Sequence, residues 1–106
     1  MEKDNNMRMA LCSELMGLVK AGLKKITIMD GYRNIRIGPA FFSTPDGSEE
    51  VQVYVTKVVH CALYRASTEE LLMDGYDDLT DAVAGLKKFY PDLRSGSEVT
   101  IIHFKL

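Results

Sequence analysis

Two stretches of the chain alternate apolar and polar side chains, which is the pattern of a β-strand. Valines alternate with polar residues in residues 51–59, and this predicts a strand with one buried and one partly wet face. Residues 25–30 alternate in the same way, with two isoleucines on one face and Thr27 and Met29 on the other. We therefore predict a strand in each stretch.

Two further segments contain the residue types of strands. β-Branched and aromatic side chains fill residues 99–106, and residues 35–42 are similar but contain Gly38 and Pro39. Because proline cannot donate a backbone hydrogen bond, we expect the second segment to lie at a sheet edge or to contain a bulge.

Helical spacing and capping signals predict three helices. Apolar residues recur at helical spacing in a segment that Ser13 caps and Gly22 ends. The sequence Ser67-Thr68-Glu69-Glu70 is a capping box and opens a short second helix. A third helix begins at Asp77 or Asp78.

This order of elements is helix, three strands, two helices and a last strand, which indicates an α+β fold. Because strands outweigh helices, we expect a small mixed β-barrel or curled sheet flanked by two or three short helices. Residues 1–8 are polar and charged, so we expect a flexible terminus there and a single domain over residues 9–106.

The composition excludes several classes of protein. The formal net charge is −2 and the pI is about 5.6, so bulk positive charge does not attract this chain to nucleic acid, and we expect no DNA partner. No apolar run reaches the roughly 20 residues that span a bilayer. Cys12 and Cys61 have no zinc-ligand spacing and predict free thiols. We expect a cytoplasmic protein with no membrane partner.

Metal and cofactor sites lack a sequence signal. The acidic segment 74–78 does not have the spacing of a calcium loop, and helix capping accounts for its last two aspartates, whereas Asp74 has no assigned capping role. His60 and His103 are more than 40 residues apart and favour structural roles. We predict no metal and no cofactor.

Lys24 and Thr27 are the first candidates for chemistry. An amine beside a hydroxyl can accept the hydroxyl proton and so activate the oxygen as a nucleophile. The alternative is a solvated lysine and a threonine that merely favours a strand. Residues three apart on a regular strand point to opposite faces, so the pair meets only if Lys24 precedes the strand or a bulge redirects it.

A group of positive residues surrounds Tyr32 in the sequence. Five lysines and arginines fall within 17 positions: Lys20, Lys24, Lys25, Arg33 and Arg36. They could contact phosphates beside a pocket, or they could simply form a solvated face.

The segment Gly22-x-Lys24-x-x-Thr27-Ile28 followed by Asp30 resembles the signature of the ASCH domain, which belongs to the PUA-like superfamily and is linked to RNA. The nearest resemblance is to its small bacterial members, the N(4)-acetylcytidine amidohydrolase family. Phe89-Tyr90-Pro91 and the final strand resemble the same family, so that the likeness runs from about Met9 onward.

The resemblance implies roles for particular residues. Lys24 falls on the lysine that activates the nucleophile, Thr27 on the threonine that attacks the acetyl carbonyl, and Asp74 on the acid that protonates the leaving amine. Substrate contacts are expected from Lys25, Arg33, Arg36 and Tyr76. The family's motif usually ends in arginine where this chain has Met29, and its acid is usually glutamate rather than aspartate.

The implied function is hydrolysis of the acetyl amide of a modified cytidine, with a small nucleoside as partner. The alternative is a non-catalytic module of the same fold that binds RNA or a nucleotide, and a third, weaker hypothesis is a ribonuclease.

Overall fold

The computed structural model describes residues 7–106, which divide into two compact units. The first unit contains the residues up to Lys25 together with Ile35–Val58 and His103–Leu106. The second unit contains Ile26–Asn34 and Val59–Ile102. Each unit is described by itself below.

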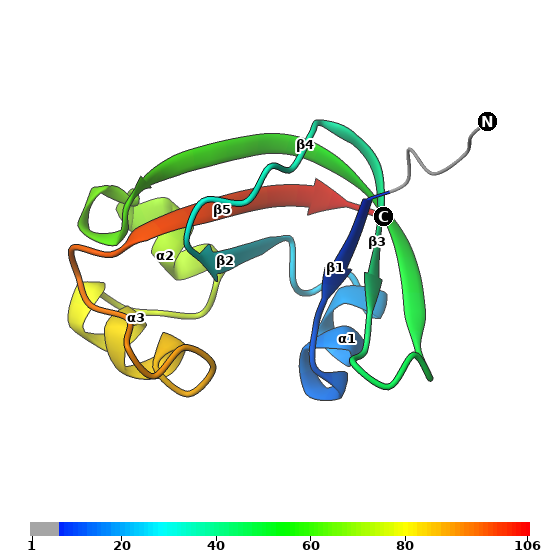
Figure 1. The fold of residues 1–106 in the computed structure, drawn as a ribbon, viewed down its shortest axis with the longest axis horizontal. Coiled ribbons are helices and arrows are strands. Elements are labelled where there is room, and N and C mark those ends of the chain that lie inside the picture. Colours follow the sequence, from blue (N-terminus) through cyan, green and yellow to red (C-terminus); the bar gives the residue numbers. More distant parts are fainter. Residues whose placement is uncertain (1–6) are drawn as a thin grey trace. The chain divides into compact units, whose positions relative to one another are not determined.

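The strands form one five-stranded sheet in the order β1-β3-β4-β5-β2 (Figure 1). Strand β1 is parallel to β3, pairing Met7 with Ala40, and β3 is antiparallel to β4. The sheet is therefore mixed, and the α+β fold class is confirmed. The strands are β1 (Met7–Ala10), β2 (Ile26–Asp30), β3 (Gly38–Ser43), β4 (Glu50–Ala62) and β5 (Glu98–Lys105).

Helix α1 (Ser13–Lys20) belongs to the first unit. Its apolar positions Met16 and Val19 are fully buried, as the helical spacing predicts. In the same unit Phe42 of β3 and Phe104 of β5 pack edge to face, with ring centroids 4.9 Å apart. The helix begins one residue after Cys12, and the hydroxyl of Ser13 donates a hydrogen bond to Glu49 Oε2 at 2.8 Å instead of capping the helix.

The second unit contains a short 3₁₀ helix, η2 (Leu63–Arg65), and the helices α2 (Thr68–Met73) and α3 (Leu79–Leu86). Apolar residues from these helices and from the neighbouring strands form its core. That core consists of Ile26, Ile28, Leu63, Leu71, Ala82, Leu86, Leu93, Val99 and Ile101.

Both helix starts predicted in this unit are confirmed. The Ser67 hydroxyl accepts from the Glu70 N–H at 3.0 Å, and the Glu70 carboxylate accepts from the Ser67 N–H at 3.0 Å, which is a complete capping box. At α3 the carboxylate of Asp78 accepts from the N–H of Asp81 at 2.8 Å.

The structure corrects the sequence analysis at the start of the chain and at β3. Met7 and Arg8, placed in the expected flexible terminus, are the first residues of β1, whereas residues 1–6 lie outside the described part. The expectation of an edge strand or a bulge near Pro39 is wrong, because β3 lies between β1 and β4 and its register with β4 is continuous from Gly38 to Ser43. The proline is tolerated because it lies near the beginning of the strand, and the described register with β1 starts at Ala40.

Asp46 fixes the turn between β3 and β4. Its carboxylate accepts hydrogen bonds from the Ser48 N–H, the Ser48 hydroxyl and the Thr44 hydroxyl. These bonds, that from the Ser48 N–H first, lower the pKa of Asp46 from 3.8 to about 2.

We expect replacement of Asp46 by Asn to change how stability depends on pH. Because the pKa of Asp46 is lower in the folded chain, its carboxylate contributes stability above about pH 4, and this contribution disappears as the pH falls toward 2. Urea denaturation should show the free energy of unfolding of the wild type falling more steeply over this range than that of the Asp46→Asn variant. Parallel pH dependences would contradict this assignment.

Candidate functional site

The backbone at the end of α1 positions Lys24. Gly22 has φ of +76°, the left-handed conformation that glycine adopts without strain. The N–H of Gly22 donates to the Val19 carbonyl at 2.9 Å, and the N–H of Leu23 donates to the Leu18 carbonyl at 2.9 Å. This pair of bonds is a Schellman motif. The N–H of Lys24 also donates to the Leu18 carbonyl, at 3.1 Å, so the helix end holds the lysine backbone as well.

Lys24 and Thr27 are both buried, with 8% and 6% of their surface exposed. Strand β2 begins at Ile26, so Lys24 precedes the regular strand, which is one of the two conditions under which the pair can meet. Lys24 belongs to the first unit and Thr27 to the second. That their side chains meet stays a prediction.

Met29 occupies the position at which the motif usually has an arginine, and Arg33 is a candidate to replace that arginine. Met29 is 5% exposed, so a guanidinium at its position would be buried in β2. Arg33 is exposed; its Nε donates to the Asp30 carbonyl at 3.0 Å, and its N–H donates to Thr100 Oγ1 at 2.8 Å. These two bonds fix the base of the Arg33 side chain, while its end remains accessible to a ligand.

Two candidate acids lie at α2, one within the helix and one at its C-cap. Asp74 is the C-cap residue and is half-buried, and its N–H donates to the carbonyls of Glu70 and Leu71. Glu70 is 9% exposed and accepts from the Ser67 N–H in the capping box. The sequence identifies Glu70 both as a capping residue and as the alternative to Asp74 for the acid near Lys24 and Thr27, and its burial appears only in the structure.

Tyr76 lies close to Asp74 in the second unit. Its ring covers Gly85 of α3 so closely that a Cβ added there would come within 2.5 Å of the ring. Burial, and then the charges of Asp74 and Asp81, raise the pKa of Tyr76 to about 12. Tyr76 is therefore a neutral hydrogen-bond donor at physiological pH, which suits the substrate-binding role predicted for it.

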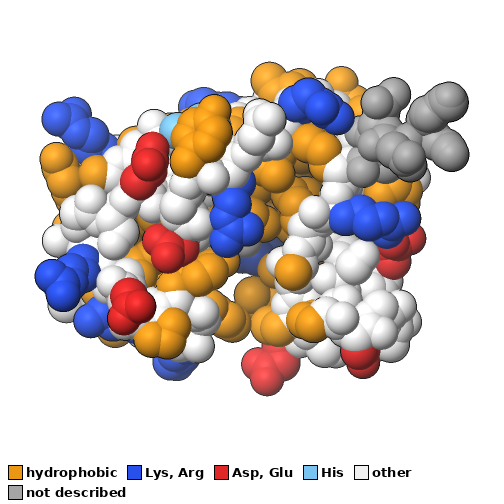
Figure 2. Space-filling view, viewed as in Figure 1, with side chains coloured by type: hydrophobic (Ala, Val, Ile, Leu, Met, Phe, Trp, Pro, Cys, Tyr) orange, Lys and Arg blue, Asp and Glu red, His pale blue; other side chains and the backbone are white. Residues whose placement is uncertain are grey.

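The predicted group of positive residues is only partly accessible. Lys24 is buried, whereas Lys20, Lys25, Arg33 and Arg36 are exposed, and Lys20 pairs with Glu49 at 3.2 Å. On the face shown in Figure 2, lysine and arginine side chains are interspersed with acidic and apolar ones.

Thr100 forms a hydrogen bond with His60, and the His60 ring stacks on the exposed Tyr32. The Thr100 hydroxyl donates to the Gly31 carbonyl at 2.8 Å and accepts from the Arg33 N–H. A hydroxyl has one proton to donate, so His60 Nδ1, 3.2 Å away, must be the donor in their contact. The His60 ring stacks on Tyr32 with centroids 4.1 Å apart, and Tyr32 is 62% exposed. This agrees with the structural role expected for His60.

Within residues 7–106, no three side chains of histidine, cysteine, aspartate or glutamate come together as a potential metal site. Both cysteines are free thiols. No helix in the same range has the length and apolar character needed to cross a membrane.

Three solved structures share the fold over most of this chain. The ASCH domain from Lactobacillus crispatus JV V101 is 16% identical, with a TM-score of 0.68, over 93% of this chain and 79% of that one. The hypothetical protein PH0355 is 20% identical, with a TM-score of 0.69, over 94% and 97%. Protein EF3133 from Enterococcus faecalis V583, of the DUF984 family, is 12% identical, with a TM-score of 0.69, over 99% and 82%.

No protein-family model and no curated protein sequence matches the chain. The likeness to these structures therefore concerns the fold, and it confirms the α+β, PUA-like class predicted from the sequence.

Two glycines of the α1 region provide a matched test of the Schellman motif. A Cβ would meet no atom within 4 Å at either Gly17 or Gly22, so only the backbone conformation distinguishes them. We expect Gly22→Ala to lower the free energy of unfolding by about 1 kcal/mol, because alanine resists positive φ. Gly17→Ala, inside α1, should raise it by up to about 1 kcal/mol. Urea denaturation measures both, and changes of the same sign would contradict the role of Gly22.

Proposed function

We propose that this chain, which has the fold of the ASCH domain, is an amidohydrolase that removes the acetyl group from a modified cytidine of the N(4)-acetylcytidine type. The burial of Lys24 and Thr27 is the observation that carries the proposal. Lysine is among the residues least often buried in folded proteins. Yet Lys24 and Thr27, the two residues selected by the motif, are among only five buried polar or charged residues in the described chain.

The proposed reaction uses Thr27 as nucleophile. Lys24 accepts the proton of the Thr27 hydroxyl as its oxygen attacks the acetyl carbonyl carbon. The bond from that carbon to the exocyclic nitrogen then breaks, and Asp74 donates a proton to the leaving amine. Cytidine departs, and water hydrolyses the acetyl ester on Thr27 to release acetate and restore the hydroxyl.

Glu70 competes with Asp74 for the role of acid. Its carboxylate is the more buried of the two, and it is a glutamate, which is the residue type that the family usually has as the acid. Asp74 is closer to Tyr76, whose pKa it raises, and Tyr76 is proposed to contact substrate. Arg33 is proposed to anchor the substrate in place of the arginine missing at Met29, with Lys25 and Arg36 as further contacts.

The enzyme hypothesis is tested by turnover of N(4)-acetylcytidine, measured as released acetate. Thr27→Val keeps the volume of the buried side chain but removes the hydroxyl, and we expect kcat/KM to fall by at least about 10³-fold. Lys24→Met should be comparably damaging, whereas Thr27→Ser, which retains the nucleophile, should keep measurable activity. Lys57→Met, at an exposed lysine of β4, is the matched control and should leave turnover unchanged.

Substitution by the isosteric amide shows which of the two carboxylates is the general acid. Asp74→Asn should slow turnover by roughly 10²–10⁴-fold if Asp74 is the general acid. Glu70→Gln retains the capping box, because glutamine serves there as well as glutamate, so its effect on turnover is free of a folding defect. No turnover by the wild-type protein, or full activity of Thr27→Val, would end the amidohydrolase hypothesis.

A binding module is the second candidate, and the exposed pair of Tyr32 and His60 favours it. Stacked aromatic rings beside an arginine are a common platform for unpaired bases, and Arg33 follows Tyr32 directly in the chain. The partner would be single-stranded RNA or a nucleotide.

RNA binding of this kind should be weak and shallow in its salt dependence. Lys25, Arg33 and Arg36 are the exposed members of the predicted group other than Lys20, which pairs with Glu49, so log K against log salt should have a slope no steeper than about −2. Titration of a fluorescent RNA at several salt concentrations measures this slope, with Tyr32→Ala expected to weaken binding about tenfold. No binding at low salt would eliminate this candidate, and shortening of the RNA would instead indicate the ribonuclease.

A further inference from the structure

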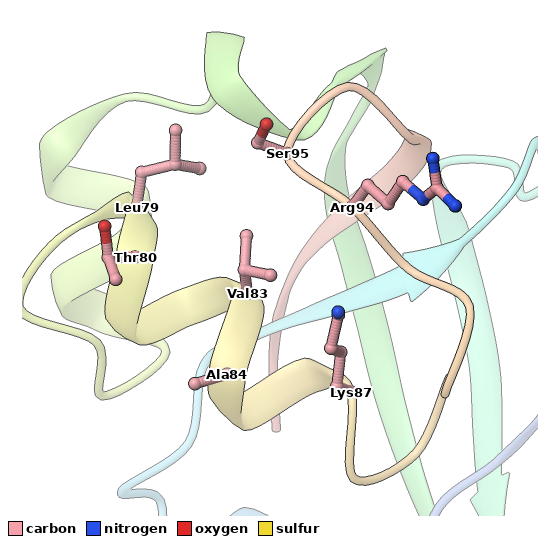
Figure 3. Close-up of a pocket in the computed structure, with 7 residues that line it drawn as sticks. All are labelled: Leu79, Thr80, Val83, Ala84, Lys87, Arg94 and Ser95. Carbon is pink, nitrogen blue, oxygen red and sulfur yellow. The ribbon is translucent and has the colours of Figure 1, made fainter.

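The second unit has a pocket of about 550 Å³ that is lined by none of the candidate site residues described above. This volume is within the roughly 300–1,000 Å³ typical of small-molecule sites. One wall is the face of α3 that carries Leu79, Val83 and Ala84, and the other is the turn that contains Arg94 and Ser95 (Figure 3).

Both walls are fixed by the core of the unit. Ala82 and Leu86 of α3 are buried in the hydrophobic cluster, and Leu79 and Val83 pack against that cluster, which holds the helix in place. On the other side Leu93 is fully buried, and the N–H of Tyr64 donates to the Ser95 carbonyl at 2.9 Å. The pocket is therefore formed before any ligand arrives, which removes an ordering cost from binding.

The pocket has an apolar end and a cationic end. Figure 3 shows Leu79 and Val83 projecting from α3 toward the turn that carries Ser95, with Lys87 and Arg94 toward the other end. Leu79 and Lys87 are eight residues apart, which corresponds to about 12 Å along a helix. A ligand that reaches both ends must combine an apolar body with a polar head.

Lys87 and Arg94 determine which charge the polar head of the ligand should carry. Neither Lys87 nor Arg94 forms an ion pair with another residue of the range 7–106, in contrast to Arg8 with Glu50 and Lys20 with Glu49. Arginine binds carboxylate and phosphate through two parallel hydrogen bonds, and lysine adds a point charge. An oxyanion is therefore the head group that complements this end.

We propose that this pocket binds a small organic anion, with its apolar body against Leu79 and Val83 and its carboxylate or phosphate held by Lys87 and Arg94. The hydroxyls of Thr80 and Ser95, which also line the pocket, add hydrogen bonds along the ligand. This site is independent of the proposed amidohydrolase, because it shares no residue with it.

Two dyes on one scaffold test the proposal. 8-Anilinonaphthalene-1-sulfonate has an apolar body with an oxyanion head, and N-phenyl-1-naphthylamine is the same body without the head. We expect saturable binding of the anionic dye, measured by fluorescence, with Lys87→Gln and Arg94→Gln each raising its Kd roughly fivefold. Lys88→Gln removes the same charge one residue away, outside the pocket, and should leave Kd within about twofold. The neutral dye should not respond to any of the three.

A bulky substitution in the pocket wall tests where the dyes bind, without changing the charge of the protein. Ala84 is exposed on the pocket wall, so Ala84→Trp should fold and should abolish binding of both dyes by filling the pocket. The proposal is overturned if the anionic dye does not bind saturably, if Lys88→Gln weakens it as much as Lys87→Gln, or if Ala84→Trp binds it like the wild type. Loss of amidohydrolase turnover in Thr27→Val leaves dye binding untouched, so the two proposals fail separately.

Discussion

The left-handed conformation of Gly22 is the constraint on which the position of Lys24 depends. A residue with a Cβ would favour continuing α1 or leaving its last carbonyls unpaired, and either change would redirect the chain after residue 20. With glycine there, the N–H groups of Gly22, Leu23 and Lys24 all satisfy carbonyls of the last helical turn. The outcome is a lysine that is buried four residues after the helix ends, although lysine ordinarily stays in water.

The second unit depends on a buried hydroxyl in a comparable way. Thr100 is fully buried in β5, where an unpaired hydroxyl would be costly, and it is satisfied by Gly31, Arg33 and His60 together. Because one oxygen makes all three contacts, the loop after β2 and the imidazole on β4 are held to the same point. Tyr32 stays exposed as a consequence, since its ring lies on His60 rather than in the core.

Sequence alone was informative where a signal is local. The capping box at Ser67 and the cap at Asp78 depend on residues three apart in the chain, and both are confirmed. Strand β1 was missed because four residues without a turn signal become a strand only through pairing with β3, more than 30 positions away. The place of Pro39 was misjudged for the same reason, since strand order is not a local property. The burial of Glu70 and Lys24, and the pocket beside α3, likewise arise from packing that no spacing rule contains.

Positive charge is buried at one of the two proposed sites and exposed at the other. This difference explains why only the first site has a sequence motif. Lys24 is buried, so it must meet a particular neighbour, and its spacing from Gly22 and Thr27 is constrained tightly enough to leave a sequence signature. Lys87 and Arg94 are exposed and come from a helix and a distant turn, so many sequences can supply such a pair. Structures with 12% to 20% identity to this chain share its fold because the fold depends on apolar periodicity rather than on these charges. Function on this fold therefore has to be argued from individual side chains, and it is at Lys24 and Thr27 that burial and motif agree.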